Sequence, residues 1–88
     1  MKIKEGFVLR RVMGNYVAVA VGEASKNFRG MVKLNATAAD IWQLVEKGYD
    51  EEKIIESMLE KYDVEKELLV SDVRTSLEML EKNGFLEI

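Results

Sequence analysis

Hydrophobic and polar residues follow two different periods along this chain, and the change comes before its midpoint. In the first part, residues 7–13, 16–21 and 31–34 are short stretches rich in β-branched and large apolar side chains, which is typical of strands. Gly14-Asn15 separates the first two stretches and is the kind of dipeptide that tight hairpin turns favour. The pattern therefore predicts three strands, the first two joined as a hairpin.

The second predicted strand has two unlike faces, because successive side chains point to opposite sides of a strand. One face carries valines, and the other carries the small side chains of Ala18 and Ala20. The alanine face would let a helix approach the sheet closely, and we expect packing there rather than a ligand. Residues 22–29 form a polar connection to the third strand, and Phe28 is expected to anchor this connection to the core.

After the strands, apolar residues recur every three or four positions, which is helical spacing. The first helix is expected over about 36–47, with Asn35 or Thr37 as its N-terminal cap and Gly48 at its end. Two further helices are expected, and the last one covers roughly residues 65–83.

Three strands followed by three helices predict an α+β fold of the winged-helix-turn-helix kind. In this fold an N-terminal three-stranded antiparallel sheet packs on a three-helix bundle. With 88 residues the chain has room for one hydrophobic core, so residues 1–88 are expected to form a single domain. No stretch has the length and apolarity of a membrane span or a signal peptide, so we expect a cytoplasmic protein without a membrane partner.

The chain contains no cysteine and no histidine. It therefore lacks a thiolate nucleophile, the usual general base near neutral pH and the commonest zinc ligands. Carboxylate pairs such as Glu51-Glu52 are typical of solvated helix surfaces, and the isolated glycines are typical of turns rather than of a phosphate-binding loop. We expect a protein that is not an enzyme and that holds no cofactor or metal.

The predicted third helix is the element that a winged-helix protein would place in the major groove of DNA. Its basic residues Arg74 and Lys82 are offset by acids such as Asp72 and Glu78, and the net charge of the chain is −3. Arg10-Arg11 adds only a weak basic patch. We expect no nucleic-acid partner, and a DNA-binding or regulatory module stays as the alternative.

Two features favour peptide binding. A three-stranded sheet has two edge strands, and an extended peptide can add to such an edge through backbone hydrogen bonds. Met79 lies off the core stripe of the third helix, where a flexible thioether suits an adaptable apolar groove, although a solitary surface methionine would show the same pattern. The candidate peptide-binding residues on the third strand and on one row of the third helix are Met31, Val32, Lys33, Leu34, Asp72, Ser76, Met79 and Asn83.

The segment Leu34–Trp42, LNATAADIW, resembles the LNxTAxxIW motif of the PqqD family. This family comprises the pyrroloquinoline-quinone biosynthesis D proteins and related stand-alone recognition elements for precursor peptides. The resemblance continues in Tyr62-Asp63-Val64, in Ser71-Asp72-Val73 and in the ending Asn83-Gly84-Phe85-Leu86, so it covers nearly the whole chain. Ala36 departs from the pattern, since many relatives carry Glu there.

The resemblance implies a domain that binds the leader segment of a ribosomally made precursor peptide. It also implies presentation of that leader to a modifying enzyme, often a radical S-adenosylmethionine (radical SAM) protein. In the family the leader adds to the third strand and lies against the third helix, which here are Met31–Leu34 and the helix row. Asn35 and Thr37 match the motif, but their chemistry favours a role as helix caps.

Two further expectations concern association. Because an exposed edge strand can pair with a second copy, we expect a monomer or a weak, hairpin-swapped homodimer. An adaptor that binds a protein rather than a leader remains a third interpretation.

Overall fold

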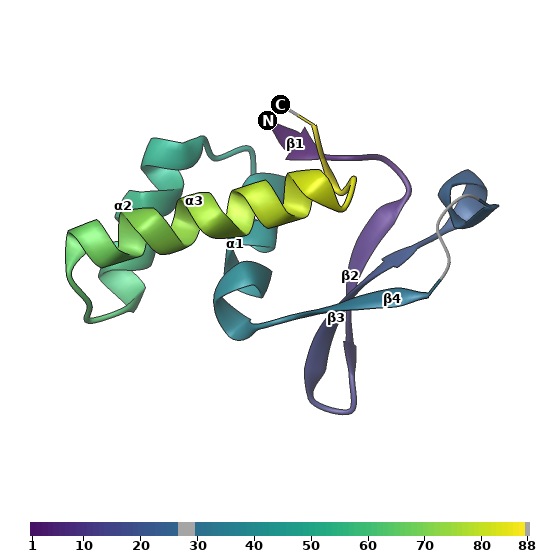
Figure 1. The fold of residues 1–88 in the computed structure, drawn as a ribbon, viewed down its shortest axis with the longest axis horizontal. Coiled ribbons are helices and arrows are strands. Elements are labelled where there is room, and N and C mark those ends of the chain that lie inside the picture. Colours follow the sequence, from purple (N-terminus) through teal and green to yellow (C-terminus); the bar gives the residue numbers. More distant parts are fainter. Residues whose placement is uncertain (27–29, 88) are drawn as a thin grey trace.

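The computed structural model describes residues 1–26 and 30–87 of the chain. Three helices and a three-stranded sheet make up most of it, together with a short 3₁₀ helix and a separate pair of two-residue strands (Figure 1). The elements are β1 (Lys2–Ile3), β2 (Phe7–Val12), β3 (Asn15–Ala20), η1 (Gly22–Lys26), β4 (Met31–Leu34), α1 (Ala36–Glu46), α2 (Glu51–Lys61), α3 (Lys66–Lys82) and β5 (Leu86–Glu87). The predicted α+β fold is confirmed. The expectation for Phe28 lies outside the described residues.

The main sheet is antiparallel and has the order β2-β3-β4. This order places β3 in the centre and leaves β2 and β4 as the two edges. The third predicted strand, Met31–Leu34, is therefore an edge strand.

The hairpin turn between β2 and β3 lies one residue earlier than the sequence predicts. Val12 pairs with Asn15, so the two turn residues are Met13 and Gly14 rather than Gly14 and Asn15. Both turn residues have positive φ, 51° for Met13 and 82° for Gly14, as a type I′ turn requires. Asn15 suits positive φ better than methionine does, but the register of the two strands decides the outcome.

The sheet turns one face toward the helices, and the alternation of side chains divides its residues cleanly between two faces. The inner face consists of Phe7, Leu9, Arg11, Tyr16, Ala18, Ala20, Val32 and Leu34, and all of these except Arg11 and Ala20 join the hydrophobic core. The outer face lies on the other side of the same strands and consists of Val8, Arg10, Val12, Asn15, Val17, Val19, Met31 and Lys33. Ala18 on the inner face is completely buried, which agrees with the predicted close packing against the small-sided face.

The helices contribute most of the core. Trp42 of α1 is fully buried and packs against Phe85, whose ring centroid lies 5.5 Å away. The ring of Phe7 on β2 also contacts Phe85, edge to face, with 5.1 Å between the ring centroids. The tail after α3 therefore joins the first helix to the sheet.

Side chains cap the N-termini of the first two helices. The side chain of Asn35 accepts a hydrogen bond from the Ala38 N–H at 2.8 Å, and Asp50 accepts one from the Lys53 N–H at the same distance. Of the two caps considered for α1, the structure selects Asn35. These bonds satisfy backbone donors that a helix start otherwise leaves free.

The two ends of the chain pair with each other, which the sequence pattern does not predict. Strand β1 runs antiparallel to β5, with Ile3 opposite Leu86 and Lys2 opposite Glu87. Figure 1 shows the two termini next to each other above α3. A strand of two residues is too short to show alternation, so no periodicity could have indicated it.

Candidate binding site

The open edge of β4 offers backbone groups whose identity follows from the strand register. In a two-residue hairpin the residues that flank the turn, here Val12 and Asn15, are hydrogen-bonded to each other. Bonded and non-bonded pairs alternate along an antiparallel ladder, so the residues of β3 that bond β4 are Tyr16 and Ala18. Their partners on β4 are Leu34 and Val32.

It follows that the other two residues of β4, Met31 and Lys33, direct their backbone N–H and C=O groups away from the sheet. Their side chains lie on the outer face, and 60% of the surface of Met31 is exposed. Val32 and Leu34 point inward, and Leu34 is buried in the core. The four predicted residues thus play two roles: Met31 and Lys33 present the open edge, whereas Val32 and Leu34 fix the strand to the domain.

The four predicted residues of α3 lie along one flank of the helix. Asp72 and Asn83 are exposed, whereas Ser76 and Met79 are half-buried and Met79 packs against the core. The side-chain amide of Asn83 donates a hydrogen bond to the backbone carbonyl of Met79 at 2.9 Å. Met79 is therefore more than a solitary surface residue, and Asn83 also closes the end of its helix.

The C-terminal end of the α3 row lies close to the sheet. Helix α3 packs chiefly on α1, α2 and β5. At its C-terminal end, Asn83 lines a pocket of about 430 Å³ together with Phe7 of β2 and with Glu23 and Ala24 of η1. The Asn83 end of the row therefore lies beside β2 and η1, at the sheet end of the domain.

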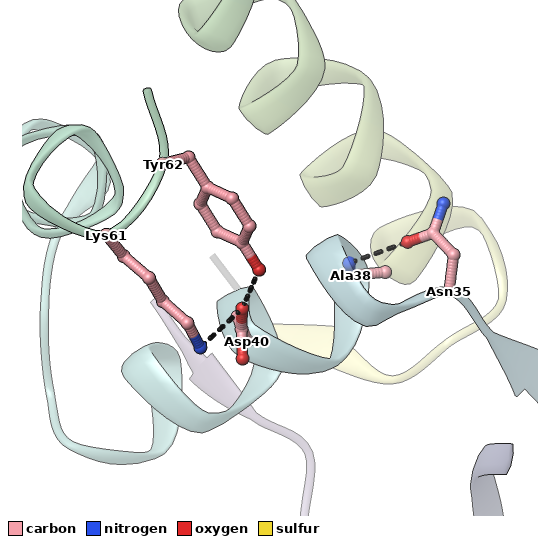
Figure 2. Close-up of polar contacts among 5 residues, drawn as sticks. All are labelled: Asn35, Ala38, Asp40, Lys61 and Tyr62. Carbon is pink, nitrogen blue, oxygen red and sulfur yellow. Dashed lines mark hydrogen bonds and ion pairs between the residues drawn. The ribbon is translucent and has the colours of Figure 1, made fainter. Parts of the chain in front are cut away.

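A polar cluster that the sequence pattern did not reveal ties α1 to the end of α2. The carboxylate of Asp40 accepts hydrogen bonds from the Tyr62 hydroxyl and from the Lys61 ammonium, the latter at 2.9 Å (Figure 2). The hydrogen bond to Asp40, helped by burial, raises the pKa of Tyr62 above its ordinary value. The same carboxylate raises the pKa of the exposed Lys61.

The raised pKa values of Tyr62 and Lys61 do not favour a role as a general base. Each proton-bearing group holds its proton more tightly than usual, which is the reverse of what a base near neutral pH needs. The residues lie more than twenty positions apart in sequence, so only the fold reveals that they meet. Among the described residues no group of histidine, cysteine or acidic side chains could hold a metal ion.

In α3, the helix considered for DNA recognition, an ion pair within the domain offsets part of the positive charge. The Arg74 guanidinium forms an ion pair with the Glu51 carboxylate at 2.9 Å, so its charge is offset within the domain. Lys82 is exposed, with Glu78 and Glu81 exposed nearby on the same helix. In the part of the chain that the structure describes, no helix is long and apolar enough to cross a membrane.

The three-stranded sheet, the three helices and the capped LNATAADIW segment define a winged-helix-like α+β domain. The family model for coenzyme PQQ synthesis protein D (PqqD) matches residues 8–86. The chain belongs to the PqqD family. The family resemblance read from the sequence is therefore confirmed. A comparison with curated proteins finds no match.

Two solved structures share the fold over almost their whole length. The chain is similar to the structure described as TbiB1 in complex with the TbiA(beta) leader peptide, with 25% identity and a TM-score of 0.80. That match covers 99% of this chain and 95% of the other. A lasso peptide synthetase B1 complexed with the leader peptide has the same fold, with 19% identity, a TM-score of 0.76 and coverage of 96% and 93%.

Proposed function

We propose that this protein binds the leader segment of a ribosomally made precursor peptide and presents it to a modifying enzyme. The observation that carries the proposal is the open edge of β4, found in a chain of the PqqD family whose fold matches that of a protein in complex with a leader peptide. The leader would add as a fourth strand beside β4, and α3 would form a second wall. The protein itself supplies no catalytic group in this proposal.

The affinity would come from two sources. The backbone groups of Met31 and Lys33 would bond the added strand, and main-chain bonds of this kind tolerate many leader sequences. Selectivity would come from side chains that meet the row Asp72, Ser76, Met79 and Asn83. Met79 would provide the adaptable apolar contact, because a thioether fits irregular partners.

The enzyme and the setting of the reaction also belong to the proposal. The family resemblance implies a radical SAM protein as the modifying enzyme, acting in the cytoplasm. A precursor gene and a radical SAM gene beside the gene for this chain would support that assignment. If a modifying enzyme of a different class is encoded there, the proposal of a radical SAM partner is wrong, but the proposal of leader binding is unaffected.

The edge mechanism can be tested at a single backbone atom. Lys33→Pro removes the N–H that the register directs toward the leader, and proline is tolerated on an edge strand when that N–H faces outward. Lys33→Ala is the matched control, because it removes the same side chain and keeps the N–H. We expect Lys33→Pro to weaken binding of the synthetic leader by about tenfold or more and Lys33→Ala by less than about threefold, measured by calorimetry.

Backbone amide shifts decide whether the proposed surface is correct. When the leader is titrated into the labelled protein, shifts should gather on β4 and on the Met79 flank of α3. Met79→Ala should weaken the leader about fivefold, whereas Glu78→Ala, on the opposite flank, should not. Shifts gathered elsewhere, or equal affinities of Lys33→Pro and Lys33→Ala in folded protein, would refute strand addition.

A further inference from the structure

The outer face of the sheet is a second surface, distinct from the open edge of β4. The strand register places its residues in rows across the three strands. Val8, Val19 and Met31 form one row, and Arg10, Val17 and Lys33 form the next. Each row continues from β2 to β4 without an acidic side chain.

None of these residues joins the hydrophobic core. Val17 is nevertheless 95% buried, because its neighbours across the sheet are the long side chains of Arg10 and Lys33. Met31 and Val12 are 60% and 42% exposed. The face is therefore an apolar surface with one cation at each side, Arg10 on β2 and Lys33 on β4.

The hairpin extends this surface at its tip. Met13 is 95% exposed and occupies a positive-φ position, which glycine or asparagine would fill more easily. An unbranched thioether at such an apex offers a flexible apolar contact. The tip and the outer face together form what we call the docking face, whose exposed apolar residues are Val12, Met13 and Met31 and whose two cations are Arg10 and Lys33.

The distribution of charged residues along the chain indicates which kind of partner the docking face would bind. Residues 1–35 contain seven basic and two acidic residues, whereas residues 36–88 contain six basic and fourteen acidic ones. The sheet end is thus cationic and the helical end anionic. A surface that complements the docking face has an apolar centre and carboxylates around it.

Other occupants fit less well. Two copies that met through this face would bring Arg10 and Lys33 of each close to those of the other, which repels. Nucleic acid requires many phosphate contacts, and this face offers two cations around an apolar centre. An acidic protein surface satisfies both the charge and the apolar area.

We propose that the docking face binds a protein surface with an apolar centre and an acidic rim, and that the modifying enzyme carries this surface. The inference rests on the proposed function for the identity of the partner. A strand added beside β4 lies in the plane of the sheet, so it would leave the docking face open. Its alternate side chains would extend that face, and the enzyme would contact domain and leader together.

This geometry couples the two binding events. If the enzyme contacts both the domain and the added strand, the leader raises the affinity of the domain for the enzyme. The enzyme then raises the affinity for the leader by the same factor. A rise of about fivefold or more in both directions is expected.

The test compares two charge reversals on one strand. Arg10→Glu combined with Met13→Asn alters the docking face, and Asn suits the positive φ at position 13. Arg11→Glu is the control, because Arg11 points to the other side of β2, where its guanidinium lies 5.3 Å from the Tyr16 ring centroid. The probes are a purified modifying enzyme and a synthetic leader peptide, chosen by searching the genes that flank the gene for this chain.

We expect the double variant to lose at least about tenfold in affinity for the enzyme and Arg11→Glu less than about twofold. Leader affinity should stay within about twofold for both. Equal loss in both variants, no loss in the double variant, or no enzyme binding by the wild type would overturn the proposal. Absence of leader binding by the wild type would instead refute the proposed function.

Two further measurements identify a different occupant. A dimer in sedimentation that the double variant abolishes would assign the face to a second copy. Flotation with phosphatidylglycerol vesicles that the double variant abolishes would assign it to an anionic membrane. Either result would overturn the proposal of an acidic protein partner.

Discussion

The side chain of Asn35 has a structural role rather than a binding role. It belongs to the most recognisable segment of the chain, yet its side chain is engaged with the Ala38 N–H at 2.8 Å. A side chain that caps a helix has its oxygen occupied. The motif therefore marks the start of α1, and the proposed binding groups lie just before it.

Asn35→Ala should lower the free energy of unfolding by about 1 kcal/mol, since the Ala38 N–H loses its partner. Asn35→Asp keeps an acceptor and should lose less. Urea unfolding of both variants measures this difference. Leader affinity should not change in either, and a large loss of affinity in Asn35→Asp would mean that this side chain contacts the leader.

Tyr62 predicts how stability depends on pH at the alkaline end. Its pKa is raised above the ordinary value of 10.0, mainly by the hydrogen bond to Asp40. A group whose pKa is raised by folding contributes stability that is complete below its unfolded pKa and is lost as the pH rises through its folded pKa. Stability should therefore fall as the pH rises above 10.0.

Urea unfolding on both sides of that pH measures the effect. Tyr62→Phe should flatten the alkaline fall. Lys61 contributes with the same sign, because Asp40 raises its pKa as well, so some slope should remain in Tyr62→Phe. An unchanged slope in that variant would mean that the hydrogen bond to Asp40 does not persist in solution.

At the scale of elements, the sequence predicts most helices and strands but not their neighbours. The strand stretches and the helical spacing are local signals, and each is confirmed with bounds that differ by a residue or two. The order β2-β3-β4 is not local, because it depends on which strands pair after folding. The open backbone groups of Met31 and Lys33 follow from that order together with the position of the hairpin turn, so the sequence alone could not reveal them.

The hairpin turn makes a specific prediction about stability. Methionine at positive φ costs about 1 kcal/mol relative to a residue that tolerates this conformation. Met13→Asn should therefore raise the melting temperature by a few degrees, and Met13→Ala, which keeps a Cβ without a compatible side chain, should not. Equal melting temperatures of Met13→Asn and wild type would show that the turn relaxes in solution.

At the scale of the whole molecule, the pairing of β1 with β5 holds the two ends of the chain on the core. Ile3 is half-buried against the core and lies opposite Leu86, whereas Lys2 and Glu87 form an exposed ion pair at 3.5 Å. Ile3→Ala should cost about 1–2 kcal/mol, less than a fully buried isoleucine would. Lys2→Ala should cost less than about 0.5 kcal/mol.

Denaturant midpoints of the two variants measure the contrast. A loss in Lys2→Ala as large as that in Ile3→Ala would assign the stability to the ion pair instead of to apolar burial. The sequence could not indicate this contact, because β1 and β5 lie at opposite ends of the chain and each has two residues. The sequence did not reveal the Tyr62–Asp40 contact for the same reason, because both contacts join positions that are distant in the sequence and meet only in the folded state.

The adjacency of the chain ends also has an engineering consequence. Because Lys2 and Glu87 lie opposite each other, a linker of a few residues could join the ends into a closed ring. For the same reason the domain could be inserted into a surface loop of another protein without spreading the host backbone. Such a circular or inserted form would keep both the β4 edge and the hairpin tip free, since neither lies near the point of attachment.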